Sequence, residues 1–331
     1  GAECSRQLWY SFRKCSKPSF DGRLYRLFNR GHREEETFAA ELRGIGCEVH
    51  EFDADGNQFE VIACDGHFKG HTDGAALGIP EAPKTWHLLE MKTASAKSFN
   101  ATKKHGVEKD KPVHFAQMQV YMHLTGLTRA LYMVVNKDSD KLYTERVRLN
   151  KKVAQGYIDK AASIINATTP PERINDNPDS FACKFCDAKA LCHGTSEESA
   201  VPVPELHCRQ CVHATPIEDG KWGCAIHGTA NGVCADHIFI PSLISFAEPT
   251  DAFENSDGSS AIEFTAEDGT IFHHGSDANA GQFNSKLLST MPRGLVLLPN
   301  AKRPGVAHNL EARYDEQHSS IVWHGPTSEV K

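Results

Sequence analysis

The sequence predicts an α/β fold in which a central mixed sheet is flanked by helices. Segments with the two-residue alternation of strands and segments with the helical spacing of apolar residues alternate through about the first 170 residues. The chain has 331 residues, of which 40% are hydrophobic, so it can bury one large core or two smaller ones. We therefore expect a globular α/β part followed by further, smaller parts.

Three helices are expected in the α/β part, over residues 29–44, 112–124 and 151–166. In the first, Asn29 suits the N-cap, and Phe38 and Leu42 share one face. Pro112 suits the first position of the second helix, where its missing N–H costs nothing. The helical spacing therefore predicts the helical layers around the sheet.

The expected strands are separated by Asp-Gly or Pro-rich breaks, which favour an antiparallel meander followed by a hairpin. They cover residues 47–52, 58–64, 66–77, 85–93, 129–136 and 142–149. Pro170-Pro171 is expected to mark the end of this part. A cysteine-rich segment and a β-rich tail should follow, the tail with short strands over residues 261–265, 270–274 and 294–298.

The most informative stretch is Gly70-His71-Thr72-Asp73-Gly74, which Glu90-Met91-Lys92 follows 17 positions after Asp73. If the two segments lie on adjacent strands, Glu90 and Lys92 share a face because side chains alternate with period 2. Two carboxylates can bind Mg²⁺ or Mn²⁺, and a neighbouring lysine can orient or deprotonate a water molecule. The pattern therefore predicts a metal site for phosphodiester hydrolysis.

Two helices add polar side chains to this pattern. His32, Glu35 and Glu36 have the spacings i, i+3 and i+4, so one helix face can present an imidazole and a carboxylate together. Gln117 and Tyr121 have the spacing i, i+4 on a later helix. The alternative is a helix and a sheet with ordinary surface charges.

On these residues the chain resembles the RecB-like exonucleases of the PD-(D/E)XK superfamily, especially their phage-encoded members. The matching motifs are Gly31-His32 with Glu35, Asp73, Glu90-Met91-Lys92, and Gln117 with Tyr121, in the family's order. The resemblance covers roughly residues 1–195 and implies a restriction-endonuclease-like core. Thr72 stands where the superfamily name has proline, a variation that the superfamily tolerates.

The resemblance also implies roles for these residues. His32, Asp73, Glu90 and the Met91 carbonyl would hold Mg²⁺ or Mn²⁺, and Lys92 would serve catalysis. Glu35 would assist the metal site, and Gln117 and Tyr121 would position DNA.

Seven of the eleven cysteines fall between Cys183 and Cys234, a grouping typical of metal or cluster ligands. Cys183, Cys186 and Cys192 are one ligand short of a tetrahedral set. RecB-like and CRISPR-adaptation nucleases with a [4Fe-4S] cluster are similar, with one early cysteine before an aromatic pair. The resemblance therefore implies Cys4 as the fourth ligand, and the alternative is zinc bound by the triplet with His193.

Cys208, Cys211, Cys224 and Cys234 form a second set, in which a short knuckle and a following hairpin fit a structural zinc ribbon. Four histidines compete as Zn²⁺ ligands and leave the set open: His207, His213, His227 and His237. The expected domains are thus a nuclease domain over 1–195, a zinc module over 203–240, and a C-terminal region of unknown role over 241–331. Cys15, Cys47 and Cys64 are expected to be packing residues.

The net charge of −7 argues superficially against a nucleic-acid partner. However, residues 240–331 contain 12 Asp or Glu and 6 Lys or Arg, so they account for most of it. Residues 1–33 interleave eight basic residues with aromatics such as Trp9, Tyr10 and Phe28, which suits a DNA channel or a solvated basic face. A lysine-rich loop over residues 97–111 could guide a DNA strand or simply be solvated.

The expected function is that of a metal-dependent DNA exonuclease in phage recombination or DNA processing. Its expected partners are single- or double-stranded DNA ends, and a recombination or single-strand-binding protein. Alternatives are a CRISPR-adaptation nuclease that trims DNA ends and a non-catalytic DNA-binding protein that retains the fold. No apolar run is long enough to span a membrane and no signal-peptide pattern is visible, so a cytoplasmic location is expected, in the host if the chain is phage-encoded.

Overall fold

The computed structural model describes residues 4–276, 282–298, 312–315 and 320–323. These residues form two compact units. Unit 1 comprises Ser19–Asn166 and Ile217–Lys221, and unit 2 comprises Cys4–Pro18, Ala167–Pro216 and the described residues from Trp222 onward. The domain ranges expected from the sequence stay predictions.

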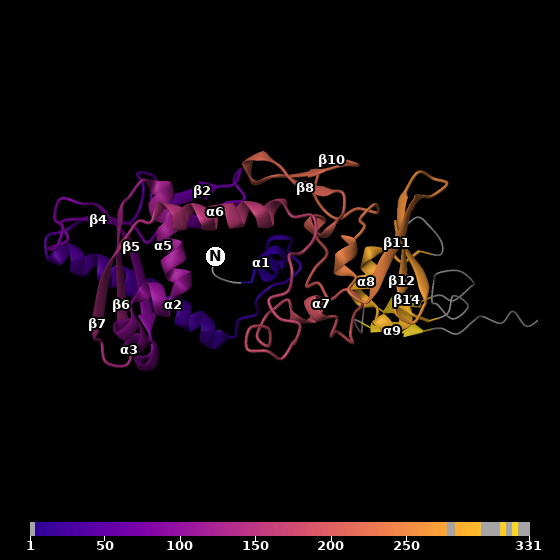
Figure 1. Cartoon of the computed structure of the whole chain (residues 1–331), viewed down its shortest axis with the longest axis horizontal. Helices are drawn as coiled ribbons and strands as arrows, with labels where there is room; N and C mark the ends of the chain where they lie inside the picture. Colours follow the sequence, from indigo (N-terminus) through magenta and orange to yellow (C-terminus); the bar gives the residue numbers. More distant parts are fainter. Residues whose placement is uncertain (1–3, 277–281, 299–311, 316–319, 324–331) are drawn as a thin grey trace, which may run out of the picture. The chain divides into compact units, whose positions relative to one another are not determined.

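Unit 1 contains a five-stranded mixed sheet in the order β1-β4-β5-β6-β7 (Figure 1). Its strands are β1 (Glu48–His50), β4 (Ala75–Leu77), β5 (His87–Ala94), β6 (Arg129–Asn136) and β7 (Leu142–Arg148). β5 and β6 are parallel and the other neighbours are antiparallel. The prediction of an α/β fold with a central mixed sheet is confirmed for this unit.

The meander prediction is wrong in one respect, because β2 (Glu60–Ala63) and β3 (Phe68–His71) form a separate hairpin. The expected strand over residues 66–77 is interrupted between β3 and β4. Gly74 adopts a φ of +118°, and a Cβ there would meet the His50 carbonyl oxygen at 2.5 Å. The chain therefore turns at the residue that follows Asp73.

Five helices belong to unit 1, namely α2 (Gly22–Gly44), α3 (Ala96–His105), α4 (Val107–Asp110), α5 (Pro112–Thr125) and α6 (Lys151–Asn166). The prediction of Asn29 as an N-cap is wrong, because Asp21 caps α2 and accepts a hydrogen bond from Leu24 N at 2.8 Å. The lysine-rich loop prediction is also wrong. Ser95 caps α3 there, and Gly106, with a φ of 77°, ends it.

Apolar clusters lie on both faces of this sheet. On one face, Phe38 and Leu42 of α2 pack with Leu89 and Met91 of β5. On the other face, Met118 of α5 belongs to a cluster with alternate residues of the same strand, beginning with Leu88. Glu90 and Lys92 have the parity of Leu88, so they point to the face that α5 covers.

Unit 2 begins with α1 (Ser5–Phe12). Trp9 and Tyr10 of this helix are fully buried, and Trp9 Nε1 donates a hydrogen bond to the Ala167 carbonyl at 2.9 Å. Arg13 is buried as well, and its guanidinium donates to the carbonyls of Ala167, Arg209 and Ala214. The DNA-channel interpretation is therefore wrong for these three residues, which pack inside unit 2.

The rest of unit 2 consists of small antiparallel sheets and short helices (Figure 1). Its described elements are α7 (Lys189–His193), β8 (Ala214–Pro216), β9 (Trp222–Cys224), β10 (Gly228–Thr229), β11 (Ala247–Glu254), β12 (Ser260–Ala266), β13 (Ile271–Gly275), α8 (Ser285–Thr290), α9 (Arg293–Val296), β14 (Ala312–Asp315) and β15 (Ser320–Trp323). The strand expected over residues 294–298 is wrong, because α9 begins there after Pro292. Among the described helices, none is long and apolar enough to span a membrane.

Candidate functional site

In unit 1, three oxygen atoms converge on one ammonium group. Lys92 Nζ lies 2.8 Å from Glu90 Oε1, 2.9 Å from the Met91 carbonyl oxygen and 3.2 Å from Asp73 Oδ2. These oxygens belong to three of the four residues that the resemblance assigns to a metal ion. The ammonium is therefore the cation that these oxygens share in this structure, and we call the four residues the Lys92 cluster.

The backbone holds the Lys92 cluster in place. Glu90, Met91 and Lys92 lie in β5, where β6 pairs with all three, while the register with β4 covers only His87 and Leu88. Asp73 follows β3, and its Oδ2 accepts a hydrogen bond from Met91 N at 2.7 Å. This bond ties the carboxylate directly to the main chain of β5. The Asp73 side chain is therefore positioned by strand geometry.

Burial controls the charges of the cluster. Glu90 is 1% exposed, and this burial raises its pKa to about 7, with Asp73 adding to the rise and Lys92 opposing it. Burial by itself would lower the pKa of Lys92, but the two facing carboxylates, Glu90 and Asp73, outweigh it and raise that pKa. One ammonium is thus shared by two carboxylates. Removing the Glu90 carboxylate from water costs free energy, because this side chain is almost fully buried.

Glu90 also leaves one polar atom incompletely compensated. Its Oε1 is buried and has no hydrogen-bond partner among the described residues, although it lies 2.8 Å from Lys92 Nζ. A buried carboxylate oxygen without a hydrogen bond is costly unless a cation compensates it. The donor set of Asp73, Glu90 and the Met91 carbonyl consists only of oxygens, which are the ligands that Mg²⁺ and Mn²⁺ prefer. These residues therefore fit a hard divalent cation.

Helix α2 brings His32 and Glu35 to one face, as their spacing predicts. His32 Nδ1 lies 3.6 Å from Glu35 Oε2, and the His32 side chain is 74% exposed. Burial and the charge of Asp73 raise the pKa of Glu35, so this carboxylate is electrostatically linked to the Lys92 cluster. Glu36 is exposed. The role of His32 as a metal ligand stays a prediction.

Helix α5 places Tyr121 beside β3. A Cβ at Gly70 would collide with the Tyr121 hydroxyl, so this glycine makes room for the ring. Burial, followed by the charges of Glu90 and Asp73, raises the pKa of Tyr121. Gln117 is half-buried, and among the described contacts no hydrogen bond joins it to the Lys92 cluster. Of the two predicted DNA-positioning residues, the structure thus brings only Tyr121 into electrostatic range of the cluster.

The sequence analysis missed His114 and Tyr132. His114 Nδ1 lies 3.1 Å from the Tyr132 hydroxyl, and Tyr132 is the register partner of Glu90 in the parallel β5–β6 pair. Burial, followed by the charges of Lys92 and Lys111, lowers the pKa of His114 to about 4, so its ring is neutral at pH 7. The spacing of His114 to Gln117 and Tyr121, i+3 and i+7, could have revealed it. Tyr132 could be identified only from the register of β5 with β6.

The first cysteine set converges on one pocket of unit 2. Cys4, Cys183, Cys186 and Cys192 all line this pocket, together with Arg6 and Tyr10 of α1. Cys183 is buried, and the backbone N–H of Ala188 is directed at the Cys186 sulfur. Residues from both ends of the predicted nuclease domain therefore meet here, and the [4Fe-4S] ligand set stays a prediction.

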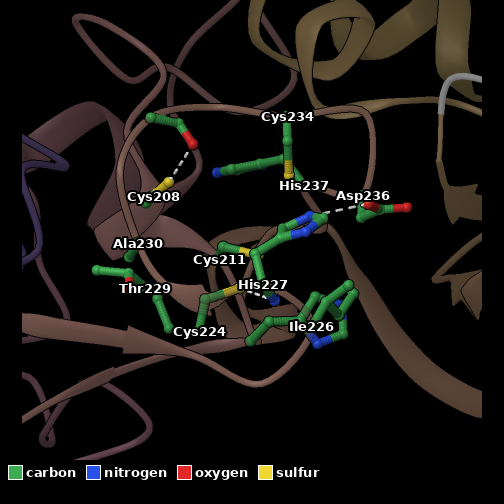
Figure 2. Close-up of a pocket in the computed structure, with 13 residues that line it drawn as sticks. Cys208, Cys211, Cys224, Ile226, His227, Thr229, Ala230, Cys234, Asp236 and His237 are labelled. Atoms are coloured by element: carbon green, nitrogen blue, oxygen red, sulfur yellow. Dashed lines mark hydrogen bonds and ion pairs between the residues drawn. The ribbon is translucent and has the colours of Figure 1, made fainter.

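The second cysteine set lines another pocket of unit 2 (Figure 2). Its four thiols belong to Cys208, Cys211, Cys224 and Cys234. The Nε2 atom of His227 lies 3.0 Å from Asp236 Oδ2 at the same pocket, as the dashed line in Figure 2 marks. In the described part of the chain, only His227, Cys234 and Asp236 bring three side-chain donor atoms within 4.8 Å of one another. The pocket thus offers more donors than one zinc ion requires.

The competing histidines differ in what they bind. Both ring nitrogens of His237 have hydrogen-bond partners, Ser285 Oγ at 2.7 Å and the His207 carbonyl at 3.1 Å. His207 Nδ1 accepts a hydrogen bond from Arg209 N at 3.1 Å. His213 Nε2 is buried without a hydrogen-bond partner among the described residues. His213 and His227 line the pocket of the second cysteine set, and neither has both ring nitrogens bonded as His237 has, so they are the histidines best placed for a metal ion there.

Comparison with protein-family models finds no match, and comparison with curated proteins finds none. Among solved structures, the SSO0001 protein is similar at 14% identity and a TM-score of 0.33, over 59% of this chain and 83% of that one. An alkaline exonuclease from Laribacter hongkongensis is similar at 17% identity and a TM-score of 0.31, over 49% of this chain and 85% of that one. A complex of the same enzyme, LHK-Exo, with dAMP is similar at 16% identity and a TM-score of 0.30, over 49% of this chain and 85% of that one.

Proposed function

We propose that unit 1 is a metal-dependent deoxyribonuclease that hydrolyses phosphodiester bonds in DNA. The observation that supports it most directly is the convergence of Asp73, Glu90 and the Met91 carbonyl on one cation, Lys92 Nζ. A second support is the burial of Glu90, a carboxylate only 1% exposed whose charge needs a cation beside it.

Each of these residues would have a separate role in hydrolysis. Asp73, Glu90 and the Met91 carbonyl would hold Mg²⁺ or Mn²⁺, which when bound would activate a water molecule and neutralise phosphate charge. Lys92, already bonded to both carboxylates, would orient that water and stabilise the negative charge that develops at the phosphate. Tyr121, whose hydroxyl lies against Gly70, would contact the DNA.

The finer proposal is an exonuclease that acts in phage recombination or DNA processing, as the resemblance in the four motifs implies. His32 would complete the metal site, Glu35 would assist it, and Gln117 would contact DNA. A CRISPR-adaptation nuclease that trims DNA ends is the alternative within enzymes. The long region that follows Cys192 disfavours it, because such enzymes usually end near the third clustered cysteine.

A non-catalytic DNA-binding protein is the alternative from another class. It predicts the loss of at least one active-site residue. Asp73, Glu90 and Lys92 are all present and in mutual contact, which favours an enzyme.

The test is cleavage of end-labelled single- and double-stranded DNA with Mg²⁺ or Mn²⁺. The parent protein should shorten at least one substrate from its ends, while Lys92→Ala and Asp73→Ala should lose activity by a factor on the order of 10² or more. Lys69→Ala, an exposed lysine of β3 paired with Glu60, is the matched control and should cut like the parent. Intact substrates with the parent, or an active Lys92→Ala variant, would contradict the proposal.

For the first cysteine pocket, the proposed cofactor is a [4Fe-4S] cluster on Cys4, Cys183, Cys186 and Cys192. Its support is that Cys4 lines one pocket with three cysteines that lie about 180 positions later in the sequence. The cluster would stabilise unit 2 by joining α1 to the segment around α7. Anaerobically purified protein should absorb visible light and contain about four iron atoms. A colourless, iron-free protein that carries zinc at these cysteines would refute it.

For the second cysteine pocket, the proposed ion is Zn²⁺ bound by Cys208, Cys211, Cys224 and Cys234. The backbone N–H groups of His213 and Asp236 are directed at the sulfurs of Cys211 and Cys234, and His227 N lies 3.5 Å from Cys224 Sγ. Burial raises the pKa of Cys211 and of Cys234, and these N–H groups oppose that rise; a bound Zn²⁺ would favour the thiolates. The ion would stabilise a segment too small to fold by itself.

Metal analysis of two variants tests this ligand set. Cys224→Ser should release the zinc, whereas His227→Ala should retain it, because His227 would act only through its contact with Asp236. Retention by Cys224→Ser together with loss by His227→Ala would instead assign the ion to the His227, Cys234 and Asp236 group.

A further inference from the structure

An exposed aromatic cluster lies at the start of α2 in unit 1. Phe20, Tyr25 and Phe28 have ring centroids 5.1 to 6.3 Å apart in edge-to-face arrangements. Their exposed fractions are 41%, 57% and 41%. Soluble proteins rarely leave three contacting aromatic rings this open to solvent without a partner.

Helix capping explains only part of this cluster. Asp21 is the N-cap, so Phe20 and Tyr25 occupy the positions of a hydrophobic staple, which fixes how the chain enters the helix. A staple does not require Phe28. The first fully buried residue of α2 is Phe38, so the preceding turns are not fixed by the core. The third ring therefore needs another reason.

The cluster is aligned with the proposed catalytic site. Tyr25, Phe28, His32 and Glu35 have the spacings i, i+3, i+7 and i+10, which lie along one side of a helix. Phe28 and Glu35 are about 10 Å apart along the axis at 1.5 Å per residue. About three stacked nucleotides, at roughly 3.4 Å each along one strand, cover that distance.

The charge around the cluster suits a nucleic-acid backbone. α2 carries Arg23, Arg26, Arg30 and Arg33, which at 3.6 residues per turn lie on another side of the helix from Tyr25 and Phe28. Within the described part of the chain, no ion pair joins Arg26 or Arg33 to a carboxylate. Open aromatic rings bind unpaired bases by stacking, and the positive charge elsewhere on the same helix would attract the phosphates over a longer range.

We propose that Phe20, Tyr25 and Phe28 form a stacking platform that binds the unpaired bases of a single-stranded DNA segment leading to the Lys92 cluster. This inference rests on the proposed nuclease function and specifies its substrate as DNA with a single-stranded end. Bases in a duplex stack on each other and are paired, so only unpaired bases can place their faces on these rings.

The test is fluorescence anisotropy of the full chain with a labelled oligo-dT strand and a labelled blunt duplex, in EDTA so that no probe is cut. The double variant Tyr25→Ala with Phe28→Ala should weaken oligo-dT binding by about 10- to 100-fold and duplex binding by less than about twofold. The pair Tyr25→Phe with Phe28→Tyr keeps both rings and should bind like the parent. Phe52→Ala, which removes an aromatic that is 53% exposed elsewhere in unit 1, is the control.

Unchanged oligo-dT binding in the double alanine variant, or an equal loss on both probes, would overturn the platform. So would a change from dimer to monomer in light scattering, because the rings would then form a contact between two copies. Binding in EDTA does not depend on cleavage. A parent protein that binds oligo-dT through these rings but cuts no DNA would therefore refute only the nuclease proposal.

Discussion

Replacing Glu90 by glutamine should stabilise the metal-free protein at alkaline pH while abolishing cleavage. Glutamine keeps the shape of the side chain and removes its charge. Burial raises the pKa of Glu90 to about 7, although Lys92 lies 2.8 Å away. The ion pair thus fails to offset the cost of burying this carboxylate, and a neutral amide avoids that cost.

The magnitude follows from the pKa. A rise from the usual 4.5 to about 7 corresponds to about 3 kcal/mol, at about 1.4 kcal/mol per pKa unit. Between these pH values the unfolded chain releases a proton that the folded protein keeps, so this contribution to stability falls as the pH rises. The advantage of Glu90→Gln over the parent should therefore be near zero at pH 4.5 and about 3 kcal/mol at pH 8.

Urea unfolding of parent and variant in EDTA, at pH 5 and pH 8, measures this difference. Comparing the two proteins at each pH cancels the groups that they share. Glu36→Gln, at an exposed carboxylate of α2, should match the parent at both pH values. A Glu90→Gln variant whose advantage does not grow with pH would refute the reasoning about Glu90.

Three further predictions concern other residues. Gly70→Ala should displace the Tyr121 ring and lower cleavage on the order of 10-fold, with little change in the thermal midpoint; equal cleavage by parent and variant would show that Tyr121 is not needed there. Burial, followed by the charges of Lys92 and Lys111, lowers the pKa of His114 to about 4. The unfolded chain therefore binds a proton that the folded protein does not, and the stability of the parent should fall relative to His114→Gln as the pH drops from about 6.5 to 4. Urea unfolding of both proteins at pH 7 and pH 5 would measure this difference. His237→Ala should cost about 2–4 kcal/mol in thermal unfolding, since both its ring nitrogens are bonded inside unit 2, and a neutral result would contradict this.

The sequence predicted the central strands of unit 1 well because their patterns are strong. β6 and α6 have the expected bounds, Arg129–Asn136 and Lys151–Asn166. The same two-residue alternation put Glu90 and Lys92 on one face, and the structure shows both in contact. Helical spacing likewise brought His32 to Glu35. Local periodicity is sufficient for such pairs, since each lies within one element.

The errors come from features that local patterns do not encode. Trp9 and Arg13 look like surface residues beside other basic residues, but their hydrogen-bond partners lie more than 150 positions away, as the bonds of both to the Ala167 carbonyl show. The register of Glu90 with Tyr132 depends on parallel pairing across α3, α4 and α5. Burial and register are tertiary properties, so residues such as His114 and Tyr132 become visible only in the folded chain.

Two buried polar side chains of unit 1 show why Glu90 is a functional candidate on physical grounds. Gln119 is fully buried, but its Nε2 donates to the Arg148 carbonyl and its Oε1 accepts from Asn150 N, so its polar groups serve the fold. Glu90 is as deeply buried, but its Oε1 faces the Lys92 ammonium at 2.8 Å, and burial raises its pKa to about 7. Buried ionisable residues with a perturbed pKa and a charged partner gather at functional sites. Glu90 therefore supports a cation-binding site by its own burial and charge, in addition to the motif in which it lies.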